Sequence, residues 1–489
     1  MKKQIAHRPS FFVHRPLALL SMLLATFSVS YGQVSLESAL KLHIPVVTVH
    51  TVNNERPTAT QVDPPEGCTG IGATNKTKVP GSLAILFQNE TLYDSGNYVE
   101  GVRGMRISLR GNSSAFATKS PYKIKLEKKA NLMMDGKVGG EDKEWLLLRE
   151  DATCINTFVG FWVNERIGLQ WTPRHQFVNL FFNDEYEGLY LLCESVKRNN
   201  DCRLAVDKKE GAIFEYDPYF WNESLSISPG WNWPEAEKMA YTFKYPKEED
   251  FTTGKVAHYQ ALFATFESSV LDGTYDQHID VSSFARWLLA HDILGTADGA
   301  GSNIFMTQKD DASPIRMANL WDFDTILKQI YWSNQHYRFF FPILLESEND
   351  AFRNEYIRLW KELSPTIVTE LLAYVDAFVA SPQGQSVKIS RQYDISKYCF
   401  RTTLEEEVAN LHRYMTNRKE WLDFAFAKEI DTTGIEEHRA LSIEPRSSTN
   451  DDEVEYYDLM GRKASPSRQH GNLLIRRHRN TGNVEKVFK

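Results

Sequence analysis

The sequence predicts an α+β protein in which a smaller, sheet-rich N-terminal part precedes a larger helical part. Strand-like segments dominate as far as Glu194, and amphipathic helical patterns dominate between Lys255 and Leu422. The chain has 489 residues, of which 42% are hydrophobic and 12% aromatic, so there is ample material for a large core. With eleven Trp and twenty-eight Phe, most of the chain is expected to fold.

The first 32 residues have the pattern of an export signal. Four cations without an acid precede an apolar run at 17–29, and the small residues Ser30 and Gly32 favour cleavage before Gln33. The alternative is an uncleaved anchor, but the run is short for a membrane helix, which needs roughly 18–20 apolar residues. We expect a secreted or cell-surface protein without a membrane span after cleavage, with the periplasm as the alternative location.

Charge and cysteine content exclude several classes of protein. Without the four cations of the signal, 52 basic residues face 64 acidic ones, a net charge of −12 with His neutral. Such an acidic chain lacks the overall charge of a nucleic-acid binder. The five cysteines include no Cys-x-x-Cys pair, so a zinc site is not expected. Cys193 and Cys202 are the closest pair in the sequence and the candidates for a disulfide.

Short alternating segments predict the strands of the N-terminal part. The expected strands lie at 43–50, 82–88, 104–109, 122–126 and 145–148. In the segment 122–126, Lys123 and Lys125 share one face and Ile124 takes the other, because side chains alternate along a strand. Two further strands, 176–182 and 188–194, flank Asn183-Asp184, which predicts a hairpin with a polar turn.

Helical spacing of apolar residues predicts the later elements. A helix is expected from Asp151, as N-cap, to about Ile167, with Gly168 ending it. Further helices are expected at 255–271 and 281–294 and within 354–422; in 281–294 the core-facing set is Phe284, Trp287, Leu288 and Ile293.

The sequence from 435 onward differs in composition from the rest. A polar linker, 447–452, precedes an expected strand at 453–460, and eight Lys or Arg face one acid between Gly461 and Lys489. A solvated basic extension is the plain alternative for this end of the chain.

The residues with most chemical information lie at 296–303 and 321–324. Asp298 is followed five positions later by Asn303, and Asp322 and Asp324 come 24 residues or more after Asp298. In protein kinases an Asp accepts the proton of the substrate hydroxyl, while an Asn and a second Asp hold Mg²⁺ against the phosphates. The alternative is that Asp298 is a turn residue and Asp322 lies in a solvated loop.

A second cluster lies upstream at 110–126. Arg110 and Gly111 precede a Ser-rich turn, and Lys119 and Lys123 follow it. A turn between strands can present backbone N–H groups to an anion, and a strand lysine can reach its phosphates. The Walker A spacing is missing, so an ordinary hairpin with solvent-facing lysines is the alternative.

Taken together, these segments resemble the spore-coat protein H (CotH) kinase family. The matching pieces are RGNSSAFATKSPYKIKL, WLLLREDATCINTFVGFWVNERIG, FVNLFFNDEYEGLYLLCESVKR, DVSSFARWLLAHDILGTADGAGSNIFMTQ and WDFD, in the family's order over about 100–345. The resemblance implies an atypical, exported protein kinase with a kinase-like two-lobe fold. It would use ATP and Mg²⁺ or Mn²⁺ to phosphorylate hydroxyls of secreted or surface proteins.

The resemblance also implies roles for individual residues. Asp298 looks like the catalytic Asp, and Asn303 and Asp322 look like metal ligands, with Asp324 as a second carboxylate. Arg110, Lys119, Lys123 and Glu194 look like nucleotide-binding residues: the two lysines compete for the phosphates, and Glu194 would border the adenine. Glu165 is a candidate partner for that lysine, although a solvent-facing Glu beside Arg166 is an equally good interpretation.

The C-terminal stretch resembles the short sorting domains of secreted Bacteroidetes proteins. These have a Tyr-Asp-Leu-x-Gly-Arg strand, a second strand and a Lys-ending terminus, which EYYDLMGRK and the final Lys489 match. The expected division is therefore a signal at 1–32, a β-rich segment at 33–100, a CotH kinase-like domain at 101–430 and a sorting tail at 436–489.

Two other functions stay open at the level of sequence. A degenerate kinase fold could act as a surface adhesion module that recognises protein or glycan without chemistry. A metal-dependent hydrolase could use the pair Asp322 and Asp324 instead.

Overall fold

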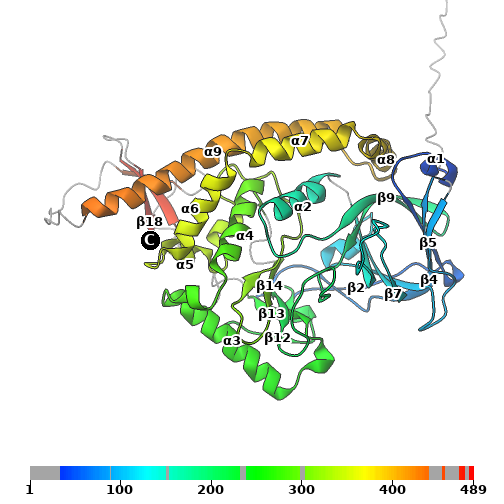
Figure 1. Ribbon diagram of the computed structural model, residues 1–489, viewed down its shortest axis with the longest axis horizontal. Coiled ribbons are helices and arrows are strands. Elements are labelled where there is room, and N and C mark those ends of the chain that lie inside the picture. The colour runs from blue at the N-terminus through cyan, green and yellow to red at the C-terminus, as the bar shows by residue number, and fades with distance from the viewer. Residues whose placement is uncertain are drawn as a thin grey trace, which may run out of the picture. The chain divides into compact units, whose positions relative to one another are not determined.

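The computed structural model describes residues 34–88, 90–149, 153–231, 238–297, 303–439, 454–457, 473–478 and 484–488, with side chains as far as 428. It contains two compact units, Met1–Phe426 and Ala427–Lys489, and the boundary falls within the helix α9. About 38% of the chain is helical and 24% is strand, which confirms the α+β class. Figure 1 shows these elements.

The first unit opens with an eight-stranded sheet of order β1-β9-β10-β8-β7-β6-β4-β5. Its strands are β1 Val46–Thr51, β4 Val79–Phe87, β5 Glu90–Asp94, β6 Met105–Leu109, β7 Tyr122–Ala130, β8 Asp142–Arg149, β9 His175–Phe182 and β10 Glu185–Glu194. The sheet closes on itself, because β1 pairs in parallel with β9 and antiparallel with β4. We call this element the closed sheet. Two short strands, β2 Thr60–Val62 and β3 Gly72–Thr74, pair with each other beside it.

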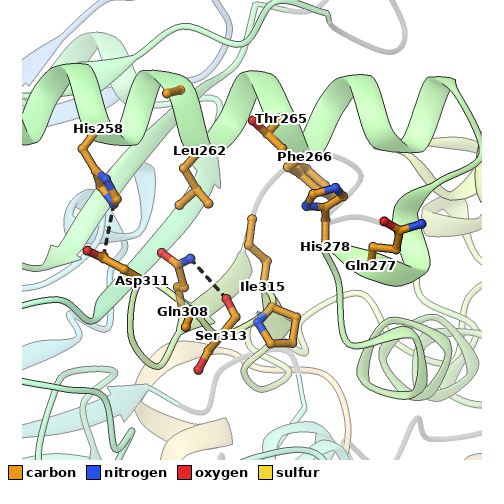
Figure 2. A pocket seen from close by; sticks show the side chains of 13 residues that line it. His258, Leu262, Thr265, Phe266, Gln277, His278, Gln308, Asp311, Ser313 and Ile315 are labelled. Atoms are coloured by element: carbon orange, nitrogen blue, oxygen red, sulfur yellow. Dashed lines mark hydrogen bonds and ion pairs between the residues drawn. The ribbon is translucent and has the colours of Figure 1, made fainter.

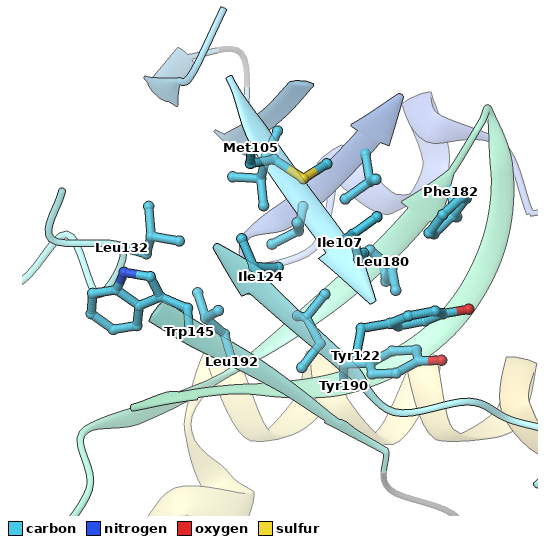
Figure 3. Packing of buried hydrophobic residues seen from close by; sticks show 14 of the residues in the cluster. Met105, Ile107, Tyr122, Ile124, Leu132, Trp145, Leu180, Phe182, Tyr190 and Leu192 are labelled. Carbon is cyan, nitrogen blue, oxygen red and sulfur yellow. The ribbon is translucent and has the colours of Figure 1, made fainter. Parts of the chain in front are cut away.

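The interior of the closed sheet is filled by apolar side chains. Figure 3 shows Met105, Ile107, Ile124, Trp145, Leu180 and Leu192 packed against one another from different strands. Ile124 is fully buried, whereas Lys123 and Lys125 on the other face of β7 are not, as the alternation predicts. The predicted hairpin is also confirmed, since Asn183 and Asp184 both have positive φ in the tight turn between β9 and β10.

A second, five-stranded sheet has the order β12-β13-β11-β14-β15. Its strands are β11 Ala212–Asp217, β12 Ser226–Ile227, β13 Ala240–Tyr245, β14 Ile304–Gln308 and β15 Arg316–Met317. The sequence did not predict these strands, because they are short and carry charged residues within aromatic segments. The arrangement therefore departs from a simple order of strands followed by helices.

The helices of the first unit follow the sequence patterns closely. They are α1 Leu36–Leu40, α2 Asn156–Arg166, α3 Thr253–Leu271, α4 Val281–Leu294, α5 Phe341–Glu346, α6 Ala351–Leu363, α7 Ile367–Ala380, α8 Pro382–Tyr398 and α9 Leu404–Arg439. The predicted core set of α4 is fully buried, with Phe284, Leu288 and Ile293 at 0% exposure. Gly168, at φ +78°, ends α2 as expected.

The predicted start of α2 is wrong. The helix begins at Asn156, and Asp151 lies outside the described residues. The backbone N–H groups of Cys154 and Ile155 donate to the carboxylate of Glu407 in α9, at 2.7 and 3.3 Å. Glu407 therefore ties the residues that precede α2 to α9.

Helix α2 lies between the closed sheet and the later helices (Figure 1). Phe158 packs against Phe177 of β9 and against Tyr374 of α7, at ring-centroid distances of 5.8 and 4.9 Å. This placement lets α2 position residues that come from the second half of the chain.

Three further findings concern cysteines, membranes and the second unit. The suggested disulfide between Cys193 and Cys202 is not formed, although both residues are buried. Among the described residues no single helix passes the length and hydropathy test for a membrane span, although the bent pair α6 and α7 passes it together. The second unit holds an antiparallel sheet of β16 Val454–Tyr457, β17 Leu473–His478 and β18 Val484–Phe488.

Candidate functional site

A small cavity of about 70 Å³ forms where four distant segments of the first unit meet. It is lined by the turn after β6, the end of β8, one face of α2, and the segment 321–324. Two of the predicted site residues, Arg110 and Asp322, therefore come together, although 212 positions separate them. The cavity is smaller than the 300–1,000 Å³ typical of ligand pockets, so it suits the reacting end of a ligand.

Asn303 and Asp322, the two predicted metal ligands, are neighbours. The side-chain amide nitrogen of Asn303 donates to Oδ2 of Asp322 at 3.4 Å. Both residues have φ of +61°, in the left-handed region that Asn and Asp tolerate better than most residues. Backbone strain of this kind persists where the surrounding structure fixes it, and it is common at functional sites.

Two buried asparagines of α2 fix the backbone around Asp322. Asn164 accepts the N–H of Leu320 at 2.7 Å, and Asn156 donates to the carbonyl of Phe323 at 3.1 Å. Phe323 packs directly on Gly160, where a Cβ would lie 2.1 Å from the ring. The close approach of ring and helix places the carboxylates on either side of Phe323 at the cavity.

Backbone hydrogen bonds join the segment after Asp324 to the segment before Asp298. The N–H of Ala297 donates to Thr325 at 3.0 Å, and the N–H groups of Leu327 and Asn334 donate to Leu294 and Thr296 at 2.7 and 3.0 Å. Asp298 itself lies in 298–302, outside the described residues. Both flanks of 298–302 are nevertheless described, and both meet the segment that carries Asp322.

The cations of the site come from the closed sheet. Arg110 lies over the ring of Trp321 at 5.4 Å, and Arg149 faces Asp324 at 3.8 Å. Burial lowers the pKa of Arg110, and the charges of Asp322 and Asp324 oppose that effect. An arginine stays charged under these conditions, so the cavity presents guanidinium groups opposite carboxylates.

Sequence reasoning missed an ion pair on the second sheet. Lys244 of β13 lies 2.9 Å from Glu215 of β11, and the Glu215 carboxylate also accepts the backbone N–H of Asn303. Burial raises the pKa of Glu215, whereas the carboxylates near Lys244, Glu215 first among them, hold the pKa of that lysine above its ordinary value despite burial. The feature of the sequence that could have indicated this ion pair is a charged residue inside an otherwise apolar, aromatic segment.

Lys76 adds a further cation near the site. Burial lowers the pKa of Lys76, the charge of Glu223 opposes that effect, and the positive charges of Arg110, Lys244 and Lys123 lower the pKa further. Carboxylates accompany these cations: Glu223 near Lys76, Glu215 beside Lys244 and Glu144 beside Lys123.

The remaining predicted nucleotide-binding residues occupy different places. Lys119 is 1% exposed, and its ammonium lies 2.6 Å from Asp394 of α8, so the structure does not bring it to the cavity. Lys123 is partly exposed and pairs with Glu144 at 3.0 Å. Glu194 is fully buried and binds Arg174 at 2.7 Å, away from the residues that line the cavity. Glu165 is exposed on α2.

The described donors fit a divalent cation of the Mg²⁺ type. Asn303, Asp322 and Asp324 offer hard oxygen atoms, and Mg²⁺ is bound through one or two carboxylates together with substrate phosphates. No cluster of three or more His, Cys, Asp or Glu side chains suited to a metal occurs in the described part of the chain. Two carboxylates and one amide leave further positions around such an ion to water or to phosphates.

Fold and site together define an α+β protein in which the carboxylates of Asp322 and Asp324 and the guanidinium groups of Arg110 and Arg149 line one cavity. The chain belongs to the CotH kinase family: the family model described as CotH kinase protein matches residues 107–422, about two thirds of the sequence. Membership confirms the predicted family and indicates a kinase-type function. No curated protein matches the chain.

Proposed function

We propose that this chain is an atypical protein kinase that transfers the γ-phosphoryl group of ATP to hydroxyl groups of exported or surface proteins, with Mg²⁺ or Mn²⁺. The observation that carries the proposal is the contact of Asn303 with Asp322, which lines a cavity together with Arg110, in a chain of the CotH kinase family. Phosphoryl transfer depends almost wholly on positioning and charge stabilisation, which such a set supplies.

Each residue has a distinct part in the proposed reaction. Asn303 and Asp322 would hold the divalent ion, which supplies charge neutralisation of the phosphates when bound. Arg110 would bind a phosphoryl oxygen with its guanidinium group, held in place by Trp321. Asp298 would accept the proton of the substrate hydroxyl, as the family resemblance implies.

A two-lobed arrangement is part of the proposal. The closed sheet contributes Arg110 and Arg149, while the segment 321–324 contributes Asp322, and Asn303 directly precedes β14 of the second sheet. The cavity at their junction supports a cleft of the kinase type, in which phosphates lie between a sheet-rich lobe and a more helical one.

The phosphate-binding lysine is better sought near Lys244 or Lys123 than at Lys119. Lys123 is partly exposed and pairs with Glu144 at 3.0 Å, and Lys244 pairs with Glu215, whose carboxylate also accepts the N–H of Asn303. Lys119 is committed to Asp394 in a buried pair. We therefore expect Lys244→Met or Lys123→Met to weaken ATP binding more than Lys119→Met weakens it in the folded protein.

Export and the choice of substrate complete the proposal. The signal-like residues 1–32 support secretion or surface display, with the periplasm as the alternative. The substrate would be an exported or surface protein. Binding to a glycan-associated surface is instead what the alternative adhesion function would involve.

The test is intact-protein mass spectrometry after incubation of the chain from Gln33 with ATP and Mg²⁺ or Mn²⁺, with and without a generic protein substrate. We expect a phosphate-sized gain that is lost in Asp298→Ala and Asp322→Asn. Asp322→Asn is the sharper variant, because Asn tolerates the same φ and retains most of the shape while removing the charge. Asp324→Asn is the matched control and should reduce the rate less.

Three other outcomes would change the assignment. A nucleotide-sized gain would keep the site and replace the reaction by nucleotidyl transfer. Phosphate release without labelled protein would favour the hydrolase. No mass gain together with no ATP-dependent thermal shift would contradict the kinase and leave the adhesion module.

A further inference from the structure

The two ends of strand β14 lie in different surroundings. Gln308, its last residue, lines a cavity of about 310 Å³ beside α3 (Figure 2). None of the residues that line this larger cavity lines the cavity around Asp322. Asn303 directly precedes the first residue of β14 and donates to Asp322 at 3.4 Å. The contacts that hold Asn303 are therefore found where β14 begins, among its neighbouring strands.

Glu215 of the neighbouring strand β11 contacts Asn303. Strands β11 and β14 pair antiparallel, with Glu215 opposite Phe305. Asn303 lies two positions before Phe305, and the carboxylate of Glu215 accepts the backbone N–H of Asn303. Glu215 is buried, so protein groups rather than bulk water determine where its carboxylate lies.

Lys244 holds the same carboxylate from the other neighbouring strand, β13. Its ammonium lies 2.9 Å from the carboxylate of Glu215 and 5.9 Å from the centre of the Phe305 ring. The Phe305 ring in turn meets the ring of Trp321, on which Arg110 lies, at a centroid distance of 6.5 Å. Glu215 thus joins a cation on one neighbouring strand to the backbone N–H that precedes the other.

Stability alone gives little reason for this buried ion pair. Strand β13 already pairs with β11 from one end to the other. Replacing a buried ion pair by apolar residues often leaves stability unchanged or raises it. Asp217, the other buried carboxylate of β11, has local partners: it accepts the N–H of Tyr219 at 2.7 Å and the hydroxyl of Thr242 at 3.1 Å. Glu215 differs from Asp217 because one of its partners belongs to the candidate site.

Asn303 has a backbone conformation that needs such a partner. Its φ of +61° lies in the left-handed region, which residues other than glycine adopt only where the surrounding structure fixes them. A hydrogen bond to its N–H fixes the peptide plane from which the side chain departs. The direction of the side-chain amide, and hence its place beside Asp322, depends on that plane.

We infer that Glu215 is a positioning residue of the metal site: its carboxylate, held by Lys244, fixes the backbone of Asn303 and keeps the side-chain amide beside Asp322. The inference rests on the proposed role of Asn303 as a metal ligand. Groups that orient metal ligands from behind typically change metal affinity by roughly 10–100-fold when they are removed.

The test measures Mn²⁺ affinity of the full chain without ATP, from the electron paramagnetic resonance signal of free Mn²⁺. Asp322→Asn defines the part of the binding that belongs to the site. Two double variants are then compared: Glu215→Gln with Lys244→Met, and Glu215→Met with Lys244→Met. Both lack the ammonium, so any role of Lys244 in binding phosphate cancels, and they differ only in the oxygen that can accept the N–H of Asn303.

We expect the variant with glutamine to bind Mn²⁺ about as tightly as the wild type, because glutamine keeps both the length and an acceptor. The variant with methionine should bind roughly 10–100-fold more weakly, while chemical denaturation shows it to be folded. If the methionine variant does not fold, Glu215→Val with Lys244→Met takes its place, because valine favours a strand and also lacks an acceptor. Equal affinities of the glutamine and apolar variants, whether both retained or both lost, would overturn the inference.

The control is a matched ion pair in the closed sheet, Arg106 of β6 with Glu127 of β7 at 2.9 Å. Its side chains are 31% and 7% exposed, against 31% and 10% for Lys244 and Glu215. Glu127 also accepts a backbone N–H, that of Gly101 at 2.9 Å. Arg106→Met with Glu127→Met should leave Mn²⁺ affinity unchanged, and an equal loss there would contradict a role specific to Glu215.

The outcome is separable from that of the kinase proposal. A chain that transfers phosphate but binds Mn²⁺ equally in the glutamine and methionine variants would keep the kinase and overturn the role of Glu215. A chain that shows the expected difference in Mn²⁺ affinity but transfers no phosphate would keep the role of Glu215 and contradict the kinase. Absence of any Mn²⁺ binding that depends on Asp322 would overturn the role of Glu215 together with the metal site.

Discussion

At the scale of the single residue, His291 shows how burial controls protonation next to the candidate site. It is 3% exposed in α4, its Nδ1 lies 2.9 Å from the hydroxyl of Thr296, and its ring packs on Trp287. Burial lowers its pKa to about 3, and the charge of Asp292 opposes that effect. Burial therefore favours a neutral imidazole in the last turn of α4, seven positions before Asp298.

A pH dependence of stability follows from this pKa. The unfolded chain takes up the proton near pH 6.5 and the folded chain near 3, so the contribution is present above pH 6.5 and is lost as the pH falls. Between pH 7.5 and 5 this group should lower the unfolding free energy by about 2 kcal/mol. Urea unfolding at both pH values checks it: His291→Gln should show a shallower decline than the wild type, and parallel declines would contradict the expectation.

At the scale of the element, α2 carries the segment of Asp322 through one close contact. Gly160 faces the ring of Phe323, and Asn156 and Asn164 hold the adjacent backbone. A glycine in a helix interior is destabilising by itself, by about 0.5–1 kcal/mol relative to alanine. Its presence here is explained by the approach of the ring.

We expect Gly160→Ala to displace Phe323 and with it Asp322. Overpacking of this kind lowers the unfolding free energy by about 1–3 kcal/mol. The apparent affinities for the metal and for ATP, obtained from the thermal shift, should fall more than tenfold because the geometry of the metal ligands changes. Differential scanning fluorimetry at varied Mg²⁺ and ATP measures both effects. Gly254→Ala in α3 is the matched control, since its nearest atom would be 3.8 Å from the new Cβ; equal behaviour of the two variants would rule out the positioning role.

Helix α9 acts on the site through Arg418. This residue is 2% exposed and donates to the carbonyls of Asp292, Gln329, Ile330 and Tyr331, with bonds of 2.6, 3.3 and 3.0 Å to the first three. Asp292 also binds Ser333 at 2.7 Å and Tyr356 at 2.6 Å. One arginine thus joins the end of α4 to the segment after the metal ligands.

Arg418→Met should release the segment 325–334 from α4. Hydrogen–deuterium exchange should rise there, while the strands β6 to β8 keep their protection, because the lost bonds go to backbone carbonyls of this segment. Arg413→Met is the control, since Arg413 is exposed and bonds Asn410 of its own helix at 2.8 Å. A uniform rise across the whole first unit would instead indicate general destabilisation.

At the scale of the whole molecule, the buried pair Lys119–Asp394 connects the closed sheet with α8. Both side chains are fully buried and 2.6 Å apart, and Asp394 also accepts the N–H of Leu189 at 3.1 Å. A buried pair strongly penalises the loss of one partner, because the other charge is left uncompensated.

Lys119→Met should therefore lower the unfolding free energy by about 3–5 kcal/mol. The double variant with Asp394→Leu should be less destabilised than the sum of the single variants, since an apolar pair replaces the charges. Chemical denaturation of the four proteins in the cycle measures this coupling. If Lys119→Met leaves stability intact and weakens only ATP binding, Lys119 is the phosphate-binding lysine after all.

Much of the element pattern was predictable because it rests on local periodicity. The alternation in 122–126 and the apolar set of α4 lead directly to β7 and α4. The second sheet was not predictable, since Glu215 and Lys244 make its strands look mixed until their pairing is seen. The start of α2 was mispredicted because the residues before it are held by Glu407, which is about 250 positions away in sequence.

The sequence by itself determined the α+β class, the family and the residue types of the candidate site, because those depend on composition, spacing and motif. Only the tertiary structure decided which of these residues meet: Arg110 with Asp322 in one cavity, Asn303 with Asp322 at 3.4 Å, and Lys119 in a pair with Asp394. From the sequence alone, a lysine such as Lys119 could bind either a phosphate or a buried carboxylate. Long-range packing decides between these two partners, because a buried ammonium group needs a charged partner, and that partner is distant in the sequence.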